Sequence, residues 1–287
     1  MGGEWTMVHH ENDQGAASGN GPETPVWLDE PTPKESEAAR VWLAKHGIQV
    51  VTPARSLAVR IGARHTRRSG GSRFFRVYLV LFVVAMSAYF SLQFLPGVDE
   101  AEMYEGALGV FVVLALQLAQ WITIRRRERH LPTVSRPQSQ SVRQVLGGWY
   151  LAAAVITFGG GVALAVAMYV TTSARTYAWS WLVLLGMSAV AGAVVLADVL
   201  RAPARGEDEG SLAVDAVLRR EDAYLLPPAS FAVLVLFNLL VDDRQPVQFT
   251  NWLALYAGLA VVAQVIGWLT HAHARRHLPP AYYGTER

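Results

Sequence analysis

Long apolar runs alternate with short polar segments along most of this chain. Six runs contain almost no charged side chains, and they cover residues 74–95, 106–124, 149–171, 177–197, 225–241 and 251–270. A bilayer core of roughly 30 Å takes about 20 helical residues, which five of the six runs reach. The pattern therefore predicts an all-α integral membrane protein, a helical bundle with its transmembrane domain at 74–270.

Positive charge falls on every second connection between these runs. Arginines gather at 55–76, 125–143, 201–220 and 275–287, whereas 96–105 has no Lys or Arg and two other connections contain only Arg175 and Arg244. Cytoplasmic segments of membrane proteins are the ones enriched in Lys and Arg. The alternation predicts six crossings with both termini in the cytoplasm, including the tail 271–287.

The run 225–241 is the marginal one. Pro227 and Pro228 leave only 229–241 uninterrupted, a length that also fits a re-entrant or buried segment. If this run did not cross, the basic end at Arg275 would lie outside and break the alternation of charge. We therefore expect a crossing, with Tyr224 to Leu226 completing it and the prolines in the first helical turn.

Two segments 147 residues apart have similar sequences, QWITIRRRERHLP at 120–132 and GWLTHAHARRHLP at 267–279. Each fits a helix that leaves the membrane on the cytoplasmic side, with Trp121 or Trp268 at headgroup level and a proline ending the helix. The preceding helices match at only scattered positions, so convergence is favoured over gene duplication.

Ahead of the first run, residues 1–31 are rich in Gly, Glu, Asn, Asp and Pro and are predicted to be a disordered cytoplasmic tail. Residues 32–73 contain two helix signals. Thr32, Pro33 and Glu35 form a capping box that predicts a helix ending near Gly47, with Ala38, Ala39, Trp42 and Leu43 on one face.

The second signal is Thr52–Pro53, which predicts a helix with Leu57 and Ile61 on one side. Arg60 and Arg64 flank that side, as in an interfacial helix whose arginines snorkel toward the headgroups. The alternative is that two small helices pack on each other or on the inner loops.

A third polar helix is expected in the fourth connection, EDEGSLAVDAVLRREDA, with Ser211 as its cap. Val214, Val217 and Leu218 fall on one face, and Asp215, Arg219 and Asp222 on the other. With its acidic start, SLAVD and LR, this loop resembles those of uncharacterised multi-pass membrane proteins common in high-GC Gram-positive bacteria. The resemblance implies a bacterial cytoplasmic membrane and supplies no activity and no site residues.

The sequence contains no catalytic signature. Cysteine is absent, which excludes disulfides, thiolate metal sites and thiol nucleophiles, and the motifs H-E-x-x-H, G-x-S-x-G, G-x-G-x-x-G and the P-loop are missing. His273 and His277 have metal-ligand spacing but no third ligand nearby. The net charge of +2 comes from arginines that flank the runs. We therefore expect no enzyme, cofactor, metal or nucleic acid.

Within the runs, two features stand out. Gly159 to Gly161 either unwind the third helix or admit a close neighbour, and close packing is favoured, as it is for Gly186, Ser188, Ala189, Gly192 and Ala193 in the fourth. Asn238 is the polar residue of the short helix, and an amide bonded to a neighbouring helix is its ordinary interpretation.

Two functions remain open from the sequence. The first is a structural, sensory or assembly component whose cytoplasmic loops contact a protein partner; the alternative is a small permease or the membrane subunit of a transporter. The absence of a charged residue at mid-membrane depth lowers the expectation of ion-coupled transport. A polar cavity near Asn238 and Gly159 would favour transport. A solid core would favour the structural, sensory or assembly role.

Overall fold

The structure is a computed structural model that describes residues 30–65, 71–94, 106–129, 133–134, 142–206, 208–241, 245–274 and 278–286. Residues 1–29 of the expected disordered tail, the connection at 96–105 and His277 lie outside these residues. So does the side chain of His273.

The described chain is almost entirely helical. Its helices are α1 (Pro33–Lys45), α2 (Arg55–His65), α3 (Gly71–Phe90), α4 (Ala107–Glu128), α5 (Val142–Leu146), α6 (Gly148–Ala154), α7 (Gly161–Thr171), α8 (Arg175–Arg201), α9 (Glu209–Ala223), α10 (Ser230–Val241) and α11 (Thr250–Ala274). Shorter turns are the 3-10 helices η1 (Ser91–Phe94) and η4 (Val247–Phe249) and the π-helix η3 (Val155–Gly160), while the strands β1 (Val50–Pro53), β2 (Thr133–Val134), β3 (Ala204–Arg205) and β4 (Gly284–Glu286) form two small antiparallel pairs.

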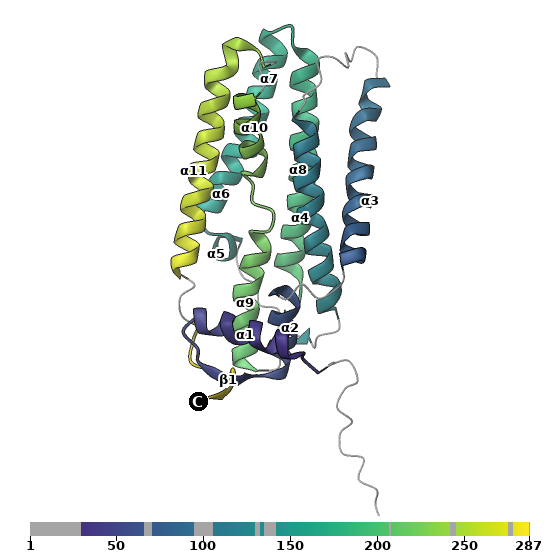
Figure 1. Ribbon diagram of the computed structural model, residues 1–287. Coiled ribbons are helices and arrows are strands. Elements are labelled where there is room, and N and C mark those ends of the chain that lie inside the picture. The colour runs from purple at the N-terminus through teal and green to yellow at the C-terminus, as the bar shows by residue number, and fades with distance from the viewer. Residues whose placement is uncertain are drawn as a thin grey trace, which may run out of the picture.

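Five helical segments are long and apolar enough to cross a membrane: Phe74–Phe94, Ala107–Arg126, Gly148–Thr171, Arg175–Arg201 and Val247–Thr270. They match five of the six predicted runs within a few residues. The third joins α6, η3 and α7 into one helix. These helices stand side by side in a bundle, with α3 at its edge (Figure 1).

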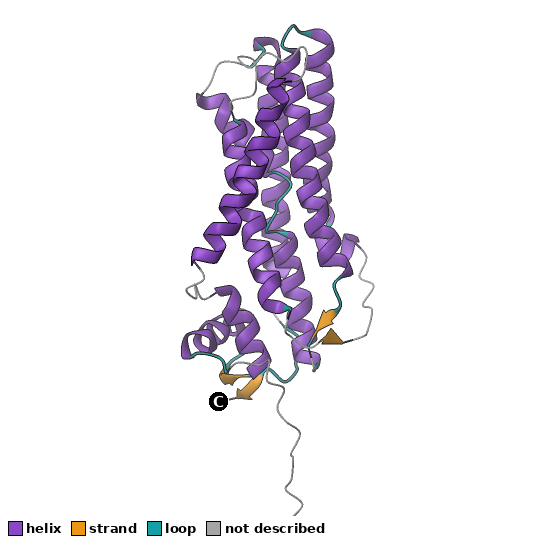
Figure 2. Cartoon of the chain, turned by 90° about the vertical axis from the view of Figure 1, so that its right-hand side faces the viewer, coloured by secondary structure: helices purple, strands orange, loops and turns teal. Residues whose placement is uncertain are grey.

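The remaining run, 225–241, contains the short helix α10, of 12 residues. Pro227 and Pro228 lie in a loop between α9 and α10 and not in the first turn of a helix, which corrects the expectation. The break consists of residues 224–229, and Figure 2 shows it as a loop within the bundle. Proline favours this break because it lacks an N–H and restricts the residue before it.

One end of the bundle carries a small packed unit, which we call the basal unit: α1, β1, α2 and β4. Strand β1 pairs with β4, so the segment between α1 and α2 lies beside the last described residues (Figure 1). The predicted capping box is present, since the Thr32 hydroxyl accepts from the Glu35 N–H and the Glu35 carboxylate accepts from the Thr32 N–H. The basal unit shares a hydrophobic core with α9.

The prediction of an interfacial helix at Leu57 and Ile61 is wrong. Both side chains are buried, at 1% and 0% exposure, in a cluster with Leu43 of α1 and Leu218 of α9. The close approach of α1 and α2 depends on Gly62, where an added Cβ would lie 2.7 Å from the Glu35 Cα. Thr52–Pro53 does not start a helix either, because both residues belong to β1. The alternative prediction, small helices packed on each other and on an inner loop, is the one that the contacts support.

Helix α9 also differs from its prediction in two respects. Its cap is Asp208, whose carboxylate accepts from the Ser211 N–H at 2.6 Å. Its polar face is covered as well as its apolar face, since Asp215 and Asp222 are 2% and 1% exposed. Charged residues are almost never fully buried unless they are paired, so their partners become the central question.

Candidate functional site

Five arginines and four carboxylates meet where the basal unit joins the bundle. Arg60 and Arg64 come from α2, Arg125 and Glu128 from the end of α4, Asp198 from α8, Arg205 from β3, and Asp215, Arg219 and Asp222 from α9. We call this set the charge cluster. Segments far apart in the chain are joined here by ion pairs.

Glu128 lies at the centre of the charge cluster and is 2% exposed. Its carboxylate accepts from Arg205 Nη1 at 2.7 Å and from Arg64 Nε at 2.8 Å, and it also contacts Arg60 and Arg125. Burial raises the pKa of Glu128, but attraction to Arg64, Arg60 and Arg125 outweighs it and lowers that pKa to about 2. Glu128 is therefore charged at neutral pH although it is buried.

The two carboxylates of α9 bind the arginines of α2. Arg60 Nη2 lies 2.5 Å from Asp215 Oδ1, and Arg64 Nη1 lies 2.6 Å from Asp222 Oδ1. Arg60 and Arg64 are four residues apart and so project from one face of α2. The pKa of Arg64 is raised because Asp222 and Glu128 outweigh its desolvation. These pairs join α2 to α9.

Arg219 links α9 to the end of α8. Its Nε lies 2.6 Å from Asp215 Oδ2, and its other nitrogens donate to the carbonyls of Ala202 and Pro203 at 2.7 and 2.6 Å. The last carbonyls of a helix lack partners within the helix and carry partial negative charge, which a guanidinium offsets. Arg219 is therefore a cap for α8 as well as an ion-pair partner.

The charge cluster holds segments together through arginine–carboxylate contacts. Each carboxylate contacts at least one arginine within 2.7 Å, and among the described residues no group of three or more His, Cys, Asp or Glu can hold a metal ion. A carboxylate fixed by arginines is a poor general base, because pairing depresses its pKa. Removing one partner of a buried pair is strongly destabilising, because it leaves the other charge without compensation.

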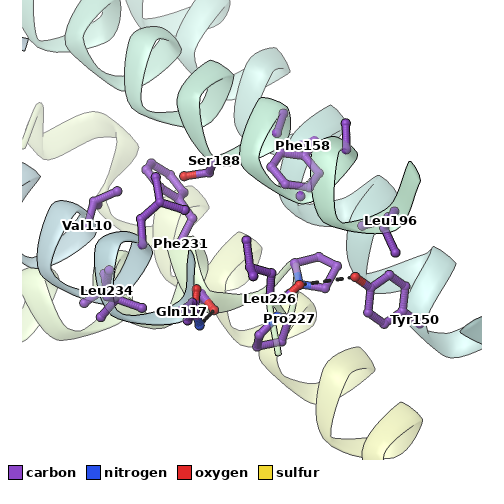
Figure 3. A pocket seen from close by; sticks show the side chains of 18 residues that line it. Val110, Gln117, Tyr150, Phe158, Ser188, Leu196, Leu226, Pro227, Phe231 and Leu234 are labelled. Carbon is purple, nitrogen blue, oxygen red and sulfur yellow. Dashed lines mark hydrogen bonds between the residues drawn. The ribbon is translucent and has the colours of Figure 1, made fainter. Parts of the chain in front are cut away.

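Helix α9 leads from the charge cluster directly into the break at 224–229. Tyr150 binds the carbonyls that the break frees. Its hydroxyl lies 3.2 Å from the oxygen of Leu226 (Figure 3) and 3.2 Å from the oxygen of Ala223. The Gln117 amide donates to the Ser230 hydroxyl at 3.1 Å. Non-helical backbone at membrane depth is tolerated where protein groups bind it in this way.

A cavity of about 300 Å³ lies beside the break. Its walls come from α4, the α6–η3 segment, α8 and α10, with Val110, Phe158, Leu196 and Phe231 among them (Figure 3). Gln117, Tyr150, Ser188 and Ser230 are its polar side chains, and three of these are engaged in the hydrogen bonds given above. The cavity is thus lined chiefly by apolar groups.

The small residues of α8 contribute to this cavity. Ser188, Ala189, Gly192 and Ala193 line it, and a Cβ added at Gly192 would meet nothing within 4 Å. The expectation that Gly186 and Gly192 admit a close neighbouring helix is therefore wrong, since Gly186 also has open space. Small side chains create room here.

The glycines of the third span were expected either to unwind the helix or to admit a close neighbour, and the structure shows both effects in this span. A Cβ at Gly161 would lie 2.9 Å from Leu185 Cδ1 and 3.0 Å from the Tyr256 hydroxyl, so close packing is confirmed there, whereas Gly159 has open space. The helix also widens into η3, where the Tyr256 hydroxyl donates to the Thr157 carbonyl at 3.0 Å. The Thr157 carbonyl thus accepts a hydrogen bond from a neighbouring helix.

Asn238 is half-buried on α10 and does not line the cavity. Its amide forms no hydrogen bond with another residue that the structure describes, so the expected bond to a neighbouring helix is not seen. The observed cavity lies near Phe158 and the break, is apolar, and fits neither the polar cavity nor the solid core set out as alternatives.

Comparison with models of protein families, with curated proteins and with solved structures found no match. The resemblance carried by the SLAVD stretch thus remains an expectation. What the protein does must be argued from the charge cluster, the break and the cavity.

Sequence reasoning named most members of the charge cluster without pairing them. One of the two interpretations of the second helix places Arg60 and Arg64 at lipid headgroups. The sequence predicts Asp215, Arg219 and Asp222 on one helix face without naming their partners, and it does not single out Glu128. The sequence does contain one signal for this pairing. Two arginines four residues apart share one face of α2, and two carboxylates seven residues apart share one face of α9, so the two faces have opposite charge.

Proposed function

We propose that this chain is a six-crossing protein of the cell membrane with both termini in the cytoplasm. Five long apolar helices support membrane insertion. Pairing of β1 with β4 supports an even number of crossings. Strand β1 precedes the membrane domain and β4 follows it, yet both lie at the same end of the bundle. The fifth crossing is α10 together with the break, and the arginine-rich segments orient the basal unit toward the cytoplasm.

Its role is non-catalytic coupling: the basal unit takes up a signal or a protein partner, and α9 transmits the change to the membrane domain. The observation that carries this proposal is that α9 belongs to both parts. It contributes Asp215 and Asp222 to the charge cluster and continues through the break to the cavity. A two-state element that both sites bias is what such coupling requires.

The cysteine-free chain offers a direct test of coupling. A single cysteine at Gly192, which lines the cavity, carries an environment-sensitive fluorophore in the full-length protein. Asp222→Asn weakens the ion pair between α9 and Arg64. Glu37→Gln, the control, removes an exposed ion pair within α1. Coupling predicts an emission shift with Asp222→Asn and none with Glu37→Gln.

Limited proteolysis of α1 and α2 is measured on the same samples. If Asp222→Asn exposes these helices to protease while the emission from position 192 stays unchanged, the basal unit and the cavity are independent. That outcome contradicts the proposed role.

The second candidate is transport, and the cavity beside a broken helix favours it, since discontinuous helices form the binding sites of many transporters. Transport requires that the cavity opens to water on one side of the membrane. A cysteine at Ser188 would then react with a membrane-impermeant thiosulfonate from one side of the membrane. Coupling without transport predicts protection of this cysteine from both sides, because an apolar lining offers water few hydrogen-bond partners.

A further inference from the structure

Two further cavities lie one above the other along the seam between the break and α11. The first, of about 210 Å³, is lined by Trp149, Arg220, Tyr224, Gly267 and Thr270. The second, of about 240 Å³, is lined by Pro227, Val261, Gln264 and Val265 with other apolar residues. Gly267 and Gln264 are about one helical turn apart, so the two cavities follow each other along α11.

The first cavity is partly polar and contains a guanidinium. Arg220 Nε is buried and has no hydrogen-bond partner among the residues that the structure describes. Arg125 and Arg205 of the charge cluster also have buried nitrogens without a hydrogen bond, but each of them contacts a carboxylate, whereas Arg220 contacts none among the residues that the structure describes. A buried donor on a cation without a partner costs free energy, and an anion bound in the cavity would remove that cost.

The depth of the first cavity points to a particular anion. Trp149 lines it and is 46% exposed, and Trp268, next to Gly267, is 59% exposed. Exposed tryptophans at the ends of membrane-spanning helices mark the headgroup level of a bilayer. Arg220 therefore lies at the level of lipid phosphate groups.

The second cavity lies deeper and is almost wholly apolar, as an acyl chain requires. Gln264 provides an amide within it, and its Oε1 is buried without a partner. A free phosphate would use the first cavity only. A phospholipid would use both, with its headgroup at Arg220 and a chain beside Pro227 and Val261.

We propose that these two cavities together bind one anionic phospholipid, with its phosphate at Arg220 and one acyl chain beside the break. The bound chain would pack against residues 224–229, so the lipid would stabilise the broken conformation of the fifth span. Its assignment to the cytoplasmic leaflet rests on the proposed orientation of the chain. Lipid binding does not depend on that orientation, so the binding proposal and the proposed orientation can each fail without the other.

The test uses the delipidated full-length protein in detergent. Dioleoyl phosphatidylglycerol is added, and native mass spectrometry counts the lipid retained while thermal unfolding reports its effect. We expect one retained lipid and a higher Tm for the wild type. Arg220→Gln should bind about ten- to a hundredfold more weakly, which corresponds to one charge-assisted contact. Arg201→Gln, at an exposed arginine on the same end of the bundle, is the matched control and should bind normally.

Further arms separate the sources of the anion. Dioleoyl phosphatidylcholine should be retained less, and inorganic phosphate alone should not raise the Tm. Arg220→Lys keeps the charge and should restore part of the binding, which ties the loss in Arg220→Gln to the positive charge, and a cooperative thermal transition of Arg220→Gln shows that this variant is folded. Equal retention by the wild type and Arg220→Gln, or equal retention of the two lipids, overturns the proposal. A full Tm shift with inorganic phosphate assigns the site to a soluble anion instead.

Discussion

Loss of the Asp222 charge should loosen the junction between the basal unit and the bundle. It is 1% exposed and lies 2.6 Å from Arg64 Nη1 and 3.4 Å from Arg125 Nη2. Asp222→Asn keeps the shape and removes the charge, so two buried guanidinium groups lose part of their compensation. We expect a loss of about 3–5 kcal/mol in the free energy of unfolding, measured by thermal or denaturant unfolding in detergent.

The control for this prediction is Glu37→Gln. Glu37 pairs with Arg40 at 2.8 Å, but both side chains are at least half exposed. Exposed pairs contribute little, so the Tm of this variant should equal that of the wild type. Equal Tm values for Asp222→Asn and Glu37→Gln would show that the charge cluster does not hold the basal unit.

Acid should weaken the junction through Glu128. Its pKa is lowered from the ordinary 4.5 to about 2 in the folded protein. A lowered folded-state pKa contributes stability that is complete above 4.5 and is lost as the pH falls toward about 2. Thermal unfolding measured across this window should show a falling Tm. Glu128→Gln should flatten that decline, and an unchanged slope in this variant would contradict the assignment.

Residue-level prediction from the sequence was accurate where the cause is local. The capping box at Thr32 and Glu35 lies within one helical turn, and it was predicted and found. The partners of Arg64 are 64 and 158 residues away, at Glu128 and Asp222. No local pattern fixes such pairs, because they depend on how α2 is placed on α4 and α9.

At the scale of elements, the third span packs against its neighbours through Gly161. Gly161→Ala would place a Cβ 2.9 Å from Leu185 Cδ1, and we expect overpacking to cost about 1–3 kcal/mol. Gly159→Ala is the matched control, since its Cβ would meet nothing within 4 Å. Unfolding of both variants in detergent measures the difference. Equal stability of the two would show that the contact with Leu185 and Tyr256 is absent.

The apolar spans were predictable because hydrophobic length alone identifies them. The five long spans agree with the sequence to within a few residues. Their internal irregularities were not all predictable: the glycines suggested unwinding or packing, and η3 with Gly161 shows both. The cavity was not predicted, since open space beside Gly192 depends on how four segments meet.

For the whole molecule, the central claim is that the chain crosses the membrane six times and that its ends meet in the cytoplasm. The fifth crossing is the critical one because α10 has 12 residues, about 18 Å, and needs the break to complete it. With five crossings, β1 and β4 would lie on opposite sides of the membrane and could not pair as they do.

The most direct test labels single cysteines in this cysteine-free chain with a membrane-impermeant maleimide in intact cells. Four exposed positions serve: Ser173 between α7 and α8, Gln248 before α11, Glu37 in α1 and Thr285 in β4. The account predicts labelling at 173 and 248 in intact cells, and at 37 and 285 only after permeabilisation. Labelling of position 285 in intact cells, or protection of 248 while 173 reacts, would contradict the six-crossing arrangement.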